Sequence, residues 1–161
     1  MKIRTPARIA LLSLACTVVA ASTAEAQQSL TLEQARAAMD AAETEAAQNQ
    51  WNLTILIADT EGVPIYLRRI DGASARSYEI ATRKVNTALA SGMHTADYAR
   101  ALAAGQTDSI PNGVTGDGGY LIRLGGQVVG AMSASGASGA EDAQVVRAGM
   151  AAIGGETVAR P

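Results

Sequence analysis

The sequence predicts an α+β fold in which helices cover one antiparallel β-sheet within a single domain. Two pairs of short apolar runs are each joined by a turn signal, which indicates two β-hairpins. Stretches with a helical period of apolar residues lie before, between and after these hairpins. Hairpin strands pair antiparallel, so the parallel sheet of a doubly wound nucleotide-binding fold is excluded. Residues 27–161, which we expect to form the mature chain, also have the size of one domain.

The N-terminal segment has the features of a secretory signal. Three basic residues precede a 13-residue apolar run, residues 9–21, and Ala24-Glu25-Ala26 has the small-x-small pattern of a cleavage site. The apolar run is shorter than the roughly 18 residues of a membrane-spanning helix. We therefore expect residues 1–26 to be a signal peptide without a membrane span, and residues 27–161 to form the mature domain in the periplasm or outside the cell.

The composition of the mature domain excludes several functional classes. Removing the signal takes away three basic residues and one acidic residue, so the net charge changes from −2 to −4, the wrong sign for a nucleic-acid binder. The only cysteine, Cys16, lies in the signal, which rules out a disulfide, a thiolate nucleophile and a Cys-ligated metal in the mature domain. One lysine, Lys84, and one histidine, His94, remain as candidate reactive groups.

The first predicted elements are a helix and a hairpin. Thr31 and Gln34 form a capping-box pattern at the start of a helical period, which predicts a helix over residues 32–49. Residues 53–58 are continuously apolar and too few for a surface helix, so they predict a buried strand. Residues 63–68 alternate in polarity after a polar turn, which predicts the second strand of the hairpin.

A central helix and a shorter helix are expected next. Apolar residues follow a helical period over residues 74–91 or 77–91, and Gly92 stands where a left-handed residue commonly ends a helix. Thr95 can then cap a short helix that extends to about Leu102.

The last third of the chain predicts a loop, a second hairpin and a final helix. Residues 105–119 contain five glycines and predict a long loop. Two apolar runs, residues 120–124 and 127–134, flank a Gly-Gly pair, which is a strong hairpin signal. Ser138 and Glu141 form a second capping box at the start of the last helix.

Several segments match one family pattern in the same order along nearly the whole mature chain. They are residues 30–35 (LTLEQA), 57–62 (IADTEG), 69–73 (RIDGA), 80–88 (IATRKVNTA) and 126–131 (GQVVGA), followed by Ser135-Gly136, Asp142 and Ala148-Gly149. In these segments the chain resembles the GlcG/HbpS-like family of haem-binding and haem-degrading domains.

The resemblance implies a profilin-like α-β-α sandwich that assembles into homo-oligomers, often octamers. It also implies haem as the cofactor, held near the end of the central helix and the turn after it. Some members of the family are secreted and report redox or haem status to a sensor protein. Residues 92–95 read Gly-Met-His-Thr, whereas the family commonly has a segment like Gly-Arg-Pro-Thr there.

The candidate haem site follows from this placement. His94 and Met93 are two types of haem ligand side by side, and imidazole is the commonest axial donor, so His94 is the candidate metal ligand. The alternative for His94 is a solvated loop residue just before the short helix. Thr95 matches a family threonine near haem, and the alternative is a purely structural helix cap. Lys84 lies on the apolar face of the central helix, where it would pair either with a haem propionate or another carboxylate, or with an Asp in a structural ion pair.

Two further hypotheses remain open at this stage. The first is an enzyme that acts on a small organic acid or aldehyde, with Lys84 and Arg69 as its catalytic residues. The structural alternative for Arg69 is a pair with Asp71 that holds the turn after the second strand. The second hypothesis is a haem-free oligomeric interaction module. No residue pattern in the chain indicates a definite reaction, so whether it is an enzyme stays undecided.

Overall fold

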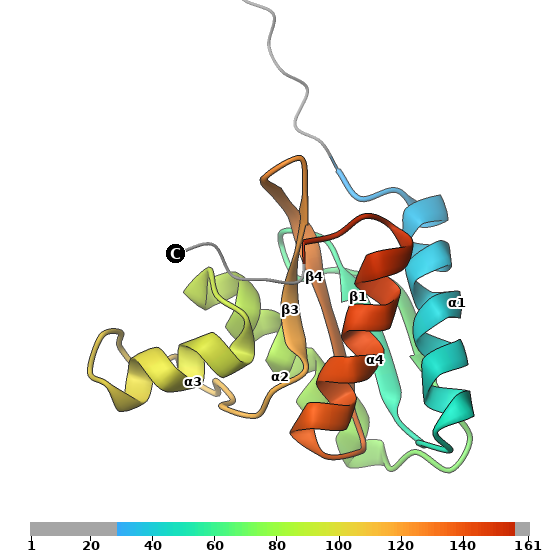
Figure 1. Ribbon diagram of the computed structural model, residues 1–161. Coiled ribbons are helices and arrows are strands. Elements are labelled where there is room, and N and C mark those ends of the chain that lie inside the picture. Colours follow the sequence, from blue (N-terminus) through green and yellow to red (C-terminus); the bar gives the residue numbers. More distant parts are fainter. Residues whose placement is uncertain (1–28, 157–161) are drawn as a thin grey trace, which may run out of the picture.

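The computed structural model describes residues 29–156 and confirms an α+β architecture, in which one four-stranded antiparallel sheet carries helices on both faces (Figure 1). The elements are α1 (Leu32–Gln48), β1 (Thr54–Ala58), β2 (Pro64–Arg69), α2 (Ala75–Ser91), α3 (Thr95–Ala103), β3 (Gly119–Leu124), β4 (Gln127–Ser135) and α4 (Gly139–Ala152). The predicted signal peptide, residues 1–26, lies outside the described residues. Within the described range, no helix has the length and apolar character needed to cross a membrane.

The sheet has the strand order β2-β1-β4-β3, so the two hairpins meet through β1 and β4 at its centre. Helices α1 and α4 pack against each other and cover one face, whereas α2 covers the other (Figure 1). Helix α3 follows α2 and projects beside the edge strand β3. The result is the α-β-α sandwich that the resemblance implied.

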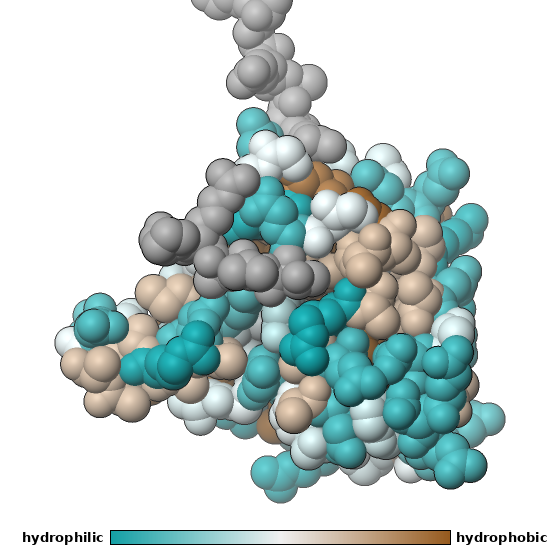
Figure 2. Space-filling view, viewed as in Figure 1, coloured by the Kyte–Doolittle hydropathy of each residue, from teal (hydrophilic) through white to brown (hydrophobic). Residues whose placement is uncertain are grey.

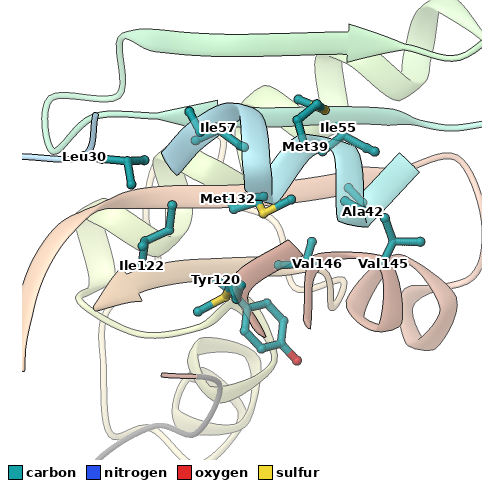
Figure 3. Close-up of a cluster of buried hydrophobic side chains, with 14 of the residues drawn as sticks. Leu30, Met39, Ala42, Ile55, Ile57, Tyr120, Ile122, Met132, Val145 and Val146 are labelled. Carbon is teal, nitrogen blue, oxygen red and sulfur yellow. The ribbon is translucent and has the colours of Figure 1, made fainter. Parts of the chain in front are cut away.

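The main core lies between the sheet and the α1–α4 pair, and it is built without phenylalanine. Figure 3 shows side chains from both helices and three strands around Met132. Gly149 of α4 allows the two helices to approach closely, because a Cβ there would lie 2.5 Å from Cε of Met132 and 2.7 Å from the carbonyl oxygen of Ala38. Figure 2 shows this side of the molecule, where hydrophilic side chains surround a weakly hydrophobic area over α4.

Local capping signals determine where three of the helices begin. Thr31 with Gln34, and Ser138 with Glu141, form the two predicted capping boxes. The side-chain oxygen of Ser74 accepts a hydrogen bond from the backbone of the residue three positions later and caps α2, which settles the start of the central helix.

The second strand, β2, begins at Pro64, one residue later than predicted, and its side chains are less buried than the alternation in polarity suggested. β2 is an edge strand, and Val63, just before it, and Leu67, within it, are 55% and 37% exposed. A sequence alternation does not reveal whether the strand lies at the centre or the edge of its sheet, and an edge strand has less cover from the helices.

The predicted glycine-rich loop occupies residues 104–118 and returns the chain from α3 to β3. Side chains of α2 and α3 hold its backbone: the N–H of Val114 donates to Oγ1 of Thr87, and the N–H of Ile110 donates to the hydroxyl of Tyr98. The guanidinium of Arg83 also donates to the carbonyl oxygens of Asn112 and Gly113. These bonds attach the loop to α2 and α3 and thereby fix the position of α3 beside the sheet.

Candidate functional site

A cavity of about 300 Å³ lies between the turn after α2, the helix α3 and the edge strand β3. Its volume is at the lower end of the range for small-molecule sites. The side chains that define its character come from these three elements and are Met93, His94, Asp97, Arg100, Leu121 and Arg123. Two of the predicted cofactor-binding residues, Met93 and His94, therefore share one cavity.

His94 and Thr95 cover the outer edge of β3. The backbone N–H of Gly119 donates to Oγ1 of Thr95, and the N–H of Leu121 donates to Nδ1 of His94, each at 3.1 Å. Both side chains are buried, with relative exposures of 6% for His94 and 0% for Thr95. Unpaired edge groups are otherwise open to water or to another chain, so these two bonds close the edge of the sheet.

The predicted helix-capping role of Thr95 is wrong. His94 occupies the N-cap position of α3 and makes no side-chain capping bond, and Thr95 is the first residue of the helix. The Thr95 hydroxyl is instead engaged by Gly119, behind the wall of the cavity. Its role in this structure is to attach α3 to β3.

The hydrogen bond from Leu121 determines which tautomer of His94 is present. Because Nδ1 accepts a hydrogen bond, a neutral ring must carry its own proton on Nε2. Burial lowers the pKa of His94 and favours this neutral form; Arg123 acts in the same direction and Asp97 opposes it. The imidazole is stacked on the ring of Tyr120, with the centroids 4.4 Å apart.

The Nε2 atom of His94 is buried and has no hydrogen-bond partner within residues 29–156. With Nδ1 engaged and Nε2 protonated, the ring presents a donor and no free lone pair. Coordination of iron through Nε2 would move the proton to Nδ1, where it would face the N–H of Leu121. No group of three or more His, Cys, Asp or Glu side chains in the described range is arranged to hold a metal ion by itself.

The charged residues of the cavity give it an excess of positive charge. Asp97 in the first turn of α3 forms an ion pair with Arg100 in the last turn, and Arg123 of β3 adds a second guanidinium. Met93 and Leu121 contribute apolar wall. Such a mixture suits a ligand with an apolar body and an anionic group.

Lys84 lies on the inner face of α2, as predicted, and its partner is a buried aspartate. Its Nζ donates to Oδ2 of Asp142 and to the carbonyl oxygen of Ala134, each at 2.8 Å. The other carboxylate oxygen of Asp142 accepts from the N–H of Ala137, and burial raises the pKa of Asp142, with Lys84 opposing the increase. Lys84 is 3% exposed and does not line the cavity beside His94. The structural ion pair is thus the arrangement that the structure contains.

Arg69 also has a structural partner. Its Nε and Nη2 atoms donate to the carbonyl oxygen of Ala73 at 2.9 and 2.5 Å, and so hold the turn between β2 and α2. The prediction that Arg69 pairs with Asp71 is wrong, because the arginine binds a backbone carbonyl of the same turn. Lys84 contacts β4 and α4 instead, so the two predicted catalytic residues do not converge on one cavity.

Sequence reasoning missed Asp97, Arg100 and Arg123 as site residues. A helical projection of α3 places Asp97, Arg100 and Ala101 on one face, which is a signal that was available. No local pattern indicates that this face lies against β3, because the contact joins segments that are separated by a long loop.

Comparisons with known proteins agree on one family. A family model described as haem degrading protein HbpS-like matches residues 30–151. Protein GlcG of Escherichia coli strain K12 is 32% identical over 108 residues, which are 66% of this chain and 81% of GlcG. A crystal structure of HbpS is 36% identical, with a TM-score of 0.71, and the match covers 83% of this chain and 97% of HbpS. A crystal structure of a PduOC:heme complex is 26% identical, with a TM-score of 0.75, and the match covers 81% of this chain and 99% of PduOC.

Proposed function

This chain belongs to the HbpS-like family of haem-degrading proteins, and from that membership we propose that it binds haem at the cavity beside His94. The observation that carries the proposal is the composition of the cavity, in which apolar side chains stand beside two guanidiniums. Haem has an apolar ring with two carboxylate side chains, and the cavity offers a matching surface for each part. The similarity to a protein crystallised with haem supports the same assignment.

The size of the cavity determines how much of the ring it would receive. At about 300 Å³ the cavity would receive one edge of a porphyrin and leave the opposite edge outside. A neighbouring copy of the chain would then cover the remainder. Met93 is half-buried on the cavity wall and offers a thioether, which is a known type of haem ligand.

The protein's own contribution is to position the ligand and exclude water from it. Bound haem supplies an iron centre for one-electron and oxygen chemistry. Leu121 and Met93 would contact the apolar part, whereas Arg100 and Arg123 would neutralise the anionic part, since all four line the cavity. We propose that the function of the protein is to bind haem, either for haem handling or for haem sensing.

Export and self-association complete the proposal. The composition of residues 1–26 supports secretion to the periplasm or the cell exterior. Membership of the family supports a homo-oligomer, with an octamer as the expected size. Contacts between copies would cover exposed apolar side chains such as Leu32, Val63, Leu67 and Tyr78. A sensor protein is the partner that we expect for such an oligomer. Light scattering of the mature protein, residues 27–161, tests the oligomer: a monomer at micromolar concentration would contradict this part.

Titration of the purified mature protein with hemin tests the central proposal. We expect a saturable change in the Soret band with a fixed ratio of haem to chain. A spectrum that remains the sum of free hemin and protein would overturn it. Addition of ascorbate in air then tests haem breakdown, because breakdown removes the Soret band and releases iron.

A further inference from the structure

We propose that the cavity beside His94 is a carboxylate-binding site, in which the Nε2–H of His94 donates a hydrogen bond to the ligand carboxylate and does not coordinate iron. For a haem propionate this rests on the proposed function. For a free small carboxylic acid it does not. Both ligands share the chemistry that the site would recognise, so the experiments below include each of them.

The first argument is the tautomer. The N–H of Leu121 occupies the lone pair of Nδ1, so neutral His94 can only donate at Nε2. A metal ligand in proteins usually has the opposite arrangement, with its second nitrogen donating to an acceptor. The backbone of β3 therefore favours the donor role of His94.

The second argument is the missing partner. Nε2 is buried, and no acceptor for it is present in the described part of the chain. A buried donor without an acceptor costs free energy, and a ligand that supplies the acceptor recovers that cost. Since Nε2 is shielded from solvent here, the ligand oxygen has to displace part of its cover, and the recovered hydrogen bond favours this displacement.

The third argument is the charge of the surroundings. Arg100 and Arg123 outnumber the single carboxylate of Asp97 in the lining of the cavity. An acceptor that also carries negative charge therefore gains from the guanidiniums, whereas a cation does not. Met93 and Leu121 form the apolar wall that would contact the hydrocarbon next to the carboxylate. A carboxylate on an aliphatic chain would therefore interact with the Nε2–H donor, the guanidiniums and the apolar wall.

Two amide substitutions separate the two nitrogens of His94. Asn reaches about as far as Nδ1, so His94→Asn keeps an acceptor for Leu121 and removes the donor at Nε2. Gln reaches about as far as Nε2, so His94→Gln keeps a donor there. We expect His94→Asn to weaken hemin binding about tenfold, as for loss of one charge-assisted hydrogen bond, and His94→Gln to retain most of the affinity. Thermal unfolding of both variants checks that the fold is intact.

Hemin dimethyl ester, in which the propionates are uncharged, tests whether the carboxylates of haem are what the site recognises. We expect it to bind the wild type more weakly than hemin and to bind wild type and His94→Asn equally. The absorption and electron paramagnetic resonance spectra of the ferric complex should be the same in wild type and variants. A change of axial ligand in His94→Asn would overturn this inference while leaving haem binding in place.

A second arm tests free carboxylates in the absence of haem. Sodium propionate is titrated into ¹⁵N-labelled protein, and the Nε2–H resonance of His94 is followed. We expect a saturable shift in the wild type and in Arg76→Met, a control on the exposed face of α2, and a loss of affinity in Arg123→Met. If hemin fails to bind and propionate shifts Nε2–H, the proposed function fails and the carboxylate site stands. If neither ligand perturbs His94, the carboxylate site is refuted.

Discussion

Nδ1 of His94 accepts a hydrogen bond from the backbone N–H of Leu121 at 3.1 Å, across 27 residues of sequence. This bond joins the turn after α2 to the free edge of the sheet. It also fixes the ring as one wall of the cavity and leaves Nε2 as a buried donor. One side chain therefore both engages an edge N–H of β3 and defines the ligand chemistry of the candidate site.

The buried His94 predicts a loss of stability in mild acid. Burial lowers its pKa below the ordinary 6.5, with Arg123 adding to the decrease and Asp97 and Asp117 opposing it. The unfolded chain then binds more protons than the folded one between the lowered pKa and 6.5, so the free energy of unfolding should fall as the pH falls through that window. Urea unfolding between pH 8 and 5 measures this. His94→Asn should flatten the profile, and an equal slope in both proteins would contradict the prediction.

Replacement of Lys84 should destabilise the fold without removing the ligand site. Lys84→Met leaves the buried carboxylate of Asp142 unpaired, which costs about 3–5 kcal/mol for an ion pair of this kind. Chemical unfolding measures the loss. The double variant with Asp142→Leu should recover much of it, since both charges are then gone. Arg76→Met, on the exposed side of the same helix, is the matched control and should change stability little. Loss of hemin binding in a folded Lys84→Met protein would show that Lys84 belongs to the site.

The hydroxyl of Thr95 should contribute to the stability of the fold. Thr95→Val has a similar shape but no acceptor for the N–H of Gly119, so we expect a loss of about 1–3 kcal/mol. Thr95→Ser keeps the oxygen and should lose less. Hydrogen exchange of the Gly119 amide gives a local readout, and faster exchange in the valine variant alone is expected. Unchanged protection of that amide would refute the assigned bond.

Gly149→Ala should destabilise the protein, although alanine is the better helix former by about 1 kcal/mol. A Cβ at this position would meet Met132 and the backbone of Ala38 at distances that require a shift of α4. Overpacking of this kind costs about 1–3 kcal/mol. The midpoint of thermal unfolding measures the balance. A higher midpoint would show that α1 and α4 can separate without cost.

The sequence was sufficient for the elements, because the signals that determine them act over a few residues. Capping at Thr31 and Ser138, the helical periods and the two turn sequences predicted every helix and strand in the described part of the chain in the right order. Errors arose where a contact outside the element decides the outcome. Thr95 was assigned to a cap because its bond to β3 has no local signature, and the exposure of Leu67 depends on β2 being at the edge of the sheet.

By itself, then, the sequence determined the fold class, the family and the scarcity of reactive groups that directed attention to Lys84 and His94. Only the tertiary structure decided what these residues do. Lys84 contacts Asp142, 58 residues away in the sequence, and His94 contacts Leu121, 27 residues away. Both contacts are made by the packing of helices on the sheet. A residue's type limits the bonds it can make, whereas its partner, its burial and hence its protonation depend on which distant segment packing brings beside it.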